Sequence, residues 1–175
     1  MNSLLKNVAA IGILSALFAC TQSAPKSSTS EQAVVQSTTD SIQLKDTHQD
    51  EVLKQYFRLK DALVASNASN AQKEATTLIT SLKASPAFAK SVRICDSIAN
   101  TNDLPKQRST FTNLSNELIA QFSKTSLLKG SFYLQFCPMA NEGNGGYWLA
   151  AEQEVRNPYY GDEMLNCGEV KKTFK

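Results

Sequence analysis

The chain has 175 residues, with 18 Lys or Arg against 16 Asp or Glu, and its formal net charge is +2. This balance offers no electrostatic basis for binding nucleic acid, so we expect no nucleic-acid partner. The length suits one domain with a linker.

Residues 1–19 have the three parts of a secretory signal peptide. Lys6 makes the start basic, residues 8–18 form an apolar run, and the small Ala19 precedes Cys20. The run is shorter than the roughly 20 residues that a membrane-spanning helix needs. A small residue followed by cysteine resembles the lipobox of bacterial lipoproteins, which implies cleavage before Cys20 and attachment of lipid to that residue. The alternative is an ordinary cleaved signal with Cys20 unmodified.

Residues 20–48 are expected to form a flexible tether behind this lipidated cysteine. Nine of the nineteen residues from Thr21 to Thr39 are Ser or Thr, and the segment has no lasting hydrophobic period. Ile42 and Leu44 are the first residues that could pack. Thr21, directly after Cys20, is not an inner-membrane retention signal of the Asp type. We therefore expect an exported protein, anchored to the cell envelope by its lipid and facing the periplasm from the outer membrane.

Residues 49–175 are expected to be the folded domain, and its first part is helical. Apolar residues recur at helical spacing in four segments separated by short joins. Ser69 with Gln72 fits a capping box for the second segment, and Asp103 with Pro105 opens the fourth. The expected helices are about 48–64, 69–85, 86–99 and 103–122. This pattern predicts a mainly α fold, an antiparallel four-helix bundle.

After Gly130 the pattern becomes β-like. The segments 131–136 and 147–150 read as strands, the residues around Asp162 as a helical turn, and those near Val170 as a final short strand. We therefore expect the bundle to be followed by a small, turn-rich, β-containing C-terminal cap.

This cap concentrates sulfur. Cys137 and Met139 lie two residues apart, and Met164 and Cys167 lie three apart, so each pair can present its sulfurs on one side of a strand or a helical turn. Thiolate and thioether ligands select Cu(I), a soft ion. The four residues are thus a candidate copper site if the two segments meet.

A disulfide is the competing interpretation of the same residues. Export places the cysteines in an oxidising compartment, where a bridge between Cys137 and Cys167 would staple a small cap. The methionines would then be core residues. Cys95 belongs to the apolar stripe of the third helix, so we expect it to be a buried free thiol.

The C-terminal motifs resemble those of a bacterial domain of unknown function. The motifs are QFCPMA from Gln135, YWL from Tyr147, NPYYG from Asn157 and MLNCGEV from Met164. That domain occurs in exported lipoproteins and at the C-terminal end of copper/silver efflux periplasmic adaptor proteins. The resemblance spans roughly residues 49–175 and implies handling of copper or a related soft metal, with copper/silver efflux components as possible partners. Many relatives carry histidines where this chain has Ser97.

An enzymatic function is the weakest of the hypotheses. His48 is the only histidine and stands at the tether–helix junction, where we expect it to be solvated. No Ser–His or Cys–His pair can therefore form elsewhere, and no phosphate loop, zinc-protease or haem-attachment motif is present. The sequence favours a Cu(I)-binding module, and the alternative is a disulfide-stapled interaction module of the cell envelope without metal.

Overall fold

The computed structural model describes Thr39 and residues 41–175. The signal peptide, Cys20 and most of the expected tether lie outside this part. In chain order the described elements are β1 (Gln43–Leu44), α2 (Thr47–Val64), α3 (Ala68–Leu82), the 3₁₀ helix η1 (Pro86–Phe88), α4 (Ala89–Ala99), α5 (Leu104–Phe122), β2 (Leu127–Lys129), β3 (Phe132–Cys137), β4 (Gly146–Ala150), the 3₁₀ helix η2 (Gly161–Glu163) and β5 (Glu169–Phe174). Four helices are present in this part of the chain, as expected, together with small antiparallel sheets.

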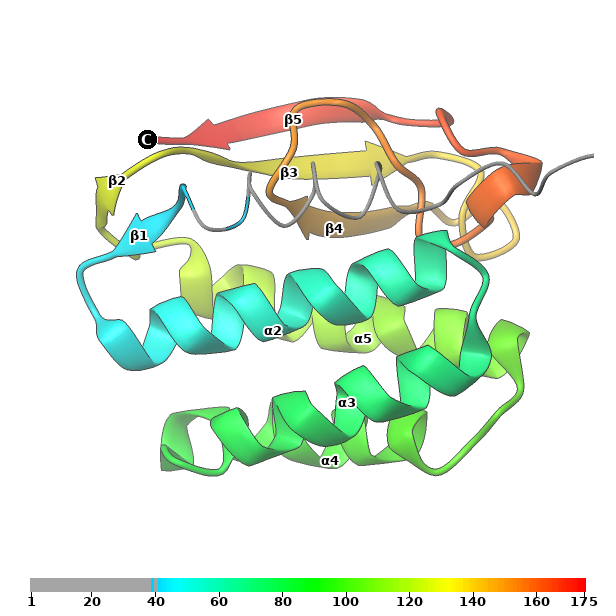
Figure 1. Ribbon diagram of the computed structural model, residues 1–175. Coiled ribbons are helices and arrows are strands. Elements are labelled where there is room, and N and C mark those ends of the chain that lie inside the picture. The colour runs from blue at the N-terminus through cyan, green and yellow to red at the C-terminus, as the bar shows by residue number, and fades with distance from the viewer. Residues whose placement is uncertain (1–38, 40) are drawn as a thin grey trace, which may run out of the picture.

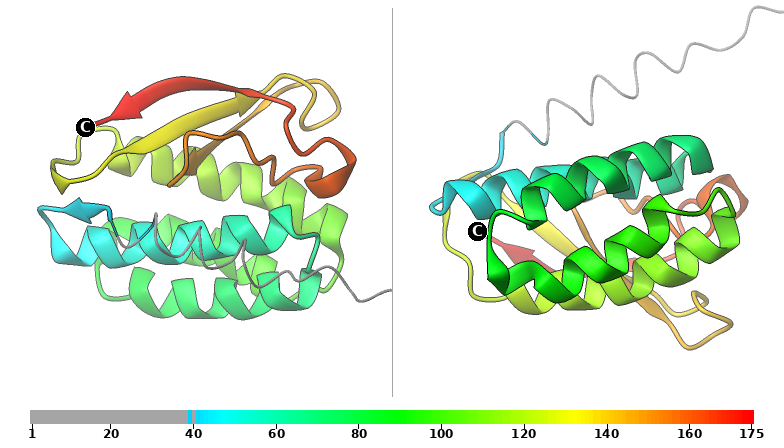
Figure 2. Two further views of the ribbon diagram at one scale, coloured as in Figure 1. Left: turned by 45° about the horizontal axis from the view of Figure 1, so that its top comes forward. Right: turned by 90° about the horizontal axis from the view of Figure 1, so that it is seen from below.

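The elements form layers (Figure 1). The sheet of β3, β4 and β5 lies along α2 and α5, and α3 and α4 form the layer beyond these two helices. Each helix packs against the next one in sequence, and β4 is the strand that contacts α5. The views in Figure 2 show that the sheet runs along the length of the helices.

Helix starts are defined by side chains that accept hydrogen bonds from free backbone N–H groups. Asp46 caps α2 and Asp103 caps α5, the latter as expected. For α3 the expected cap is wrong: Asn67, not Ser69, accepts a hydrogen bond from the backbone N of Asn70 at 2.9 Å. Ser69 lies inside the first turn of α3.

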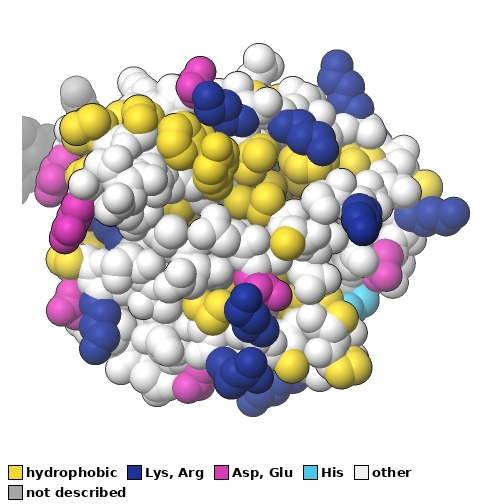
Figure 3. Space-filling view, turned by 180° about the vertical axis from the view of Figure 1, so that it is seen from behind, with side chains coloured by type: hydrophobic (Ala, Val, Ile, Leu, Met, Phe, Trp, Pro, Cys, Tyr) yellow, Lys and Arg dark blue, Asp and Glu magenta, His cyan; other side chains and the backbone are white. Residues whose placement is uncertain are grey.

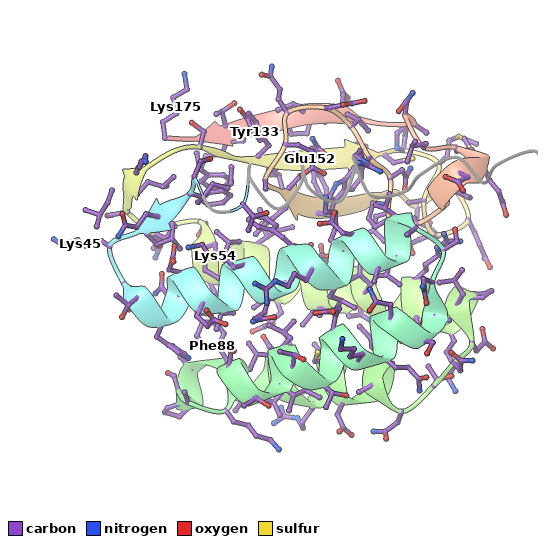
Figure 4. The ribbon with its side chains drawn as sticks, in the orientation of Figure 1. Lys45, Lys54, Phe88, Tyr133, Glu152 and Lys175 are labelled. Atoms are coloured by element: carbon purple, nitrogen blue, oxygen red, sulfur yellow. The ribbon has the colours of Figure 1, made fainter. Side chains whose placement is uncertain are left out.

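Helix α2 is buried on two sides. Its apolar residues pack on the neighbouring helix as the periodicity predicts, yet Gln55 and Lys60 are also buried. The second buried side faces the sheet layer, because Lys60 pairs with Asp61 and with Glu152, which follows β4. Figure 4 shows the labelled Glu152 above α2, at the level of the sheet.

The three-stranded sheet has the order β4-β3-β5, with both pairs antiparallel. Gln135 of β3 lies opposite Trp148 of β4, and both are fully buried. The Gln135 amide donates to the carbonyls of residues 152, 153 and 154, which belong to the segment that crosses the sheet after β4 (Figure 1). One side chain thus provides a hydrogen-bond donor to three backbone carbonyl groups of a segment that belongs to no strand.

The packed structure begins before residue 49, the expected domain boundary. Residues of β1 pair with β2, with Gln43 opposite Lys129 and Leu44 opposite Leu127. Ile42 and Leu44 are each 1% exposed and belong to the core. Packing of Ile42 and Leu44 was among the expectations, whereas this pair of short strands was not.

His48 is not solvated as expected. Its Nε2 is 2.8 Å from the carbonyl oxygen of Ser81, and its ring packs edge-on against Phe88. The residue therefore links the start of α2 to the end of α3. In the part of the chain that the structure describes, no helix is long and apolar enough to cross a membrane.

Candidate functional site: a thiol pair between two strands

Cys137 is placed by the end of β3. It lies opposite Gly146 of β4 and is fully buried. Pro138 follows at once, and because proline has no N–H group the strand pairing ends there. The chain then enters the turn that begins with Met139, whose side chain is 52% exposed.

Cys167 is placed by a buried asparagine. The backbone N of Asn157 donates to the carbonyl of Leu165 at 2.8 Å, and its Nδ2 donates to the carbonyl of Cys167 at 2.9 Å. The backbone N of Cys167 in turn donates to the carbonyl of Met164 at 3.0 Å. These bonds fix the loop between η2 and β5.

Gly168 brings this loop against β3. Its φ is +145°, and a Cβ on it would lie 2.8 Å from the carbonyl oxygen of Phe136. A side chain here would push the two segments apart. The glycine after Cys167 therefore has a structural role in bringing the two cysteines together.

The two thiols meet directly, as expected if the two sulfur-containing segments come together. The Sγ atoms of Cys137 and Cys167 are 2.9 Å apart, and both cysteines are free thiols. Cys137 is buried, whereas Cys167 is half-buried. Hydrogen bonding to Cys137, aided by burial and by the charge of the Cys137 thiolate, raises the pKa of the Cys167 thiol above its usual 9.0. The backbone N–H of Met139 lowers that pKa in part.

The two methionines lie in the segments that carry the thiols. Met139 is exposed and Met164, at the end of η2, is half-buried. The close pair itself consists of the two thiols. Among the residues that the structure describes, no group of three or more His, Cys, Asp or Glu side chains converges on one point.

Cys95 is separate from this pair, as expected from its place in the third predicted helix. It is fully buried on α4, and its thiol donates to the carbonyl of Ala75 at 3.4 Å. Burial, with a smaller effect of Asp96, raises its pKa to about 12. Such a thiol acts as a small apolar side chain.

Tyr159 and Tyr160, beside Pro158, were expected to fix a turn and do so, whereas the role of Asn157 was not predicted. Asn157 is fully buried, and the hydroxyls of Tyr159 and Tyr160 donate to the carbonyls of Tyr147 and Met139 at 2.6 and 2.5 Å. The NPYYG motif thus ties the turns beside Cys137 to the loop of Cys167. The Asn-Pro step in this motif could have indicated the role of Asn157. Asparagine side chains in turns often form hydrogen bonds with nearby backbone groups.

Fold and site together define a helical domain that carries a thiol pair on a small antiparallel sheet. Residues 52–130 match the model of a family described as Protein of unknown function (DUF3347). The matched segment runs from α2 to the end of β2 and stops before the thiol pair. No curated protein and no solved structure gave a significant match.

Proposed function

We propose that this protein binds Cu(I) through Cys137 and Cys167 and takes part in copper handling or resistance. The observation that carries the proposal is the contact between the two thiols, 2.9 Å apart at the meeting point of β3 and the loop before β5. Metal–thiolate bonds are about 2.3 Å long, so two thiolates on one ion lie about 3.8 Å apart in tetrahedral and about 4.6 Å apart in linear coordination. The pair, at 2.9 Å, would have to open by roughly 1 Å or more to admit the ion, which a side-chain rotation of the half-buried Cys167 could supply.

The donor set favours a soft monovalent ion. Two thiols, with Met139 and Met164 in the adjoining segments, are the ligands that Cu(I) prefers. Binding through both cysteines releases up to two protons, because each thiol must ionise before it becomes a ligand. The thiols are the principal ligands in this proposal, and the methionine thioethers are weaker, neutral helpers.

The proposal includes the setting that the N-terminus suggests. The protein is exported, carries lipid on Cys20 and faces the periplasm from the outer membrane, where a four-helix bundle with a C-terminal cap presents the sulfur. The resemblance to domains attached to copper/silver efflux adaptors supports copper/silver efflux components as partners. Its role is binding rather than catalysis. The Cys20→Ala precursor should lose membrane association, and its retention in the membrane fraction would exclude Cys20 as the anchor.

A competition titration with a Cu(I) chelator, under reducing and anaerobic conditions, tests the metal site. Cys137→Ser and Cys167→Ser should each remove most of the affinity, whereas Met139→Leu and Met164→Leu should cost less at nearly constant volume. Cys95→Ser is the matched control, because this thiol is buried in α4 away from the pair. Equal competition by the wild type and the double Cys137/Cys167→Ser variant would refute the site. Zn(II) binding as tight as Cu(I) would contradict the choice of metal.

A disulfide-stapled interaction module without metal is the second candidate function. The same thiol contact favours it, because two cysteines in contact in an oxidising compartment are suited to form a bridge. Mass spectrometry of the protein isolated from the cell envelope distinguishes the two. A mass two hydrogens below that of the reduced protein, with no reactive thiol at residues 137 and 167, would support the disulfide.

A further inference from the structure

One end of the molecule carries exposed lysines around an exposed leucine. Lys45, Lys124, Leu128 and Lys129, here called the basic corner, are all exposed, and Leu128 is 62% exposed. The β1–β2 pair brings them together, since Leu44 lies opposite Leu127 and the backbone N of Lys45 donates to the carbonyl of Ser126 at 2.9 Å. Lys45 and Lys124 line one shallow depression.

The charge of the basic corner is not neutralised within the described part of the protein. None of its three lysines takes part in an ion pair there. Asp46 lines the same depression and caps α2, and its single negative charge leaves the three lysines with an excess of two positive charges. Figure 4 shows Lys45 reaching away from the body of the molecule.

The opposite end of the molecule carries exposed acidic residues. Glu142, Asp162 and Glu163 are exposed there, around the turns that adjoin the thiol pair. In Figure 3, seen from behind, Asp and Glu side chains gather along the left edge, and most of the Lys and Arg side chains that project on the right lie toward the β1–β2 end, although each end carries both signs of charge.

We propose that the basic corner docks on the surface of an anionic phospholipid bilayer. Lysines near such a surface are attracted to its headgroups, and an exposed leucine between them can enter the interface. Three lysines and one leucine give only weak binding. The inference rests on the lipid anchor proposed above, because a short tether keeps the domain at millimolar local concentration, where weak contacts are populated.

The proposed contact would fix the orientation of the domain. The chain enters the described structure at the basic corner, and β3 leads from β2 to Cys137 at the far end (Figure 1). The eight residues from Lys129 to Cys137 span at most about 28 Å of extended chain. Docking at the basic corner would therefore turn the thiol pair toward the periplasm and away from the lipid.

Acetylation footprinting of the lipidated full-length protein tests this orientation. The protein is reconstituted in phosphatidylcholine vesicles and in vesicles containing 40% phosphatidylglycerol, and the acetylation rate of each lysine is measured by mass spectrometry. On the anionic vesicles, we expect Lys45, Lys124 and Lys129 to react about 3–10 times more slowly, and 0.5 M salt should restore their rates. Lys73 and Lys106, exposed on α3 and at the start of α5, serve as reference residues.

A variant and its matched control sharpen the test. Lys124→Glu/Lys129→Glu should remove the protection of Lys45, whereas Lys73→Glu/Lys106→Glu should leave it unchanged. Equal rates on the two kinds of vesicle, or equal slowing of the reference lysines, would overturn the proposal. Protection in native envelope fractions but not on the anionic vesicles would assign the basic corner to a protein partner and also overturn it.

A flotation experiment with the same two kinds of vesicle distinguishes an error in the proposed lipid anchor from an error in the proposed role of the basic corner. Protein that floats with anionic vesicles but not with phosphatidylcholine vesicles would contradict the anchor and support the basic corner. Protein that floats with neither would exclude the anchor, and with it the inference that rests on the anchor.

Discussion

Lys60 is a charged residue in an unusual environment, since lysine side chains are normally exposed to solvent. Its side chain is fully buried on α2 and pairs with Asp61 and Glu152. Burial lowers the pKa of this amine, but the two carboxylates outweigh burial and raise it above 10.5. Lysine is almost never fully buried unless it is paired, and this pairing joins α2 to the segment after β4.

Lys60→Met should destabilise the protein by about 3 kcal/mol, because it leaves two partly buried carboxylates without their cation. Urea unfolding at neutral pH measures the change. Lys54→Met is the matched control: Lys54 pairs with Asp50 on the same helix, but with both side chains partly exposed, and should cost no more than about 0.5 kcal/mol. Equal losses in the two variants would contradict a special role for the buried pair.

The pH dependence of Lys60 follows from the direction of its pKa. A raised pKa in the folded state means that the contribution to stability is complete below 10.5 and is lost as pH rises through the folded value. The difference in unfolding free energy between wild type and Lys60→Met should therefore be constant from pH 7 to 9 and shrink in more alkaline solution. A difference that grows above pH 10.5 would contradict this sign.

The three described cysteines should differ in reactivity. In the reduced native protein, iodoacetamide should modify Cys167 first, because Cys137 and Cys95 are buried. The reaction should continue to accelerate above pH 9, since hydrogen bonding to Cys137 raises the pKa of Cys167. Peptide mass mapping over a pH series checks both points. Faster labelling of Cys95 than of Cys167 without unfolding would contradict the packing of α4.

At the scale of elements, α2 illustrates how far the sequence pattern was informative. Periodicity located the helix and the stripe that packs on its neighbour. It gave no indication that Lys60 is buried, because a lysine does not contribute to a hydrophobic period. The burial of Lys60 and its pairing with Glu152 show a second buried face, turned toward the segment after β4. A tertiary contact with residue 152 leaves no local signal in the sequence of α2.

The short strands β1 and β2 could not be predicted for a related reason. A strand of two residues, Gln43–Leu44, is too short to show alternation, and its partner lies more than 80 residues further along the chain. By contrast, the start of α5 was predicted correctly, because Asp103 and Pro105 form a local cap signal.

The cap of α3 offers a direct test at this scale. Asn67→Ala should cost about 1 kcal/mol, because it leaves the backbone N–H of Asn70 without its acceptor. Ser69→Ala, the change that the capping-box prediction would have called damaging, should be neutral within about 0.5 kcal/mol. Thermal or urea unfolding distinguishes them, and the opposite ranking would restore Ser69 as the cap.

At the scale of the whole molecule, the candidate site could be predicted from the sequence only in part. The concentration of sulfur identified Cys137 and Cys167 as neighbours. The fixing of Cys167 by Asn157, and the approach allowed by Gly168, depend on backbone geometry across ten residues and across strands. Such contacts have no spacing rule from which they could be predicted.

The thiol pair also connects redox state to global stability. A bridge between cysteines 30 residues apart should stabilise the oxidised protein by about 3–4 kcal/mol in the loop-entropy model. Unfolding in the presence of a disulfide oxidant and of a reductant measures this. The Cys137/Cys167→Ser variant should show no difference between the two conditions. A redox dependence that survives in this variant would exclude the pair as its source.

The position of β5 has a mechanical consequence. In its sheet it pairs with β3 alone, from Phe132 opposite Phe174 to Phe136 opposite Glu169. A force applied at residue 175 and directed away from β3 loads these pairs one after another, so the strand should peel at low force. In the oxidised protein the peeling should stop at Cys167, because a covalent link to Cys137 would carry the load. In single-molecule pulling, the released length should therefore report whether the two sulfurs are joined.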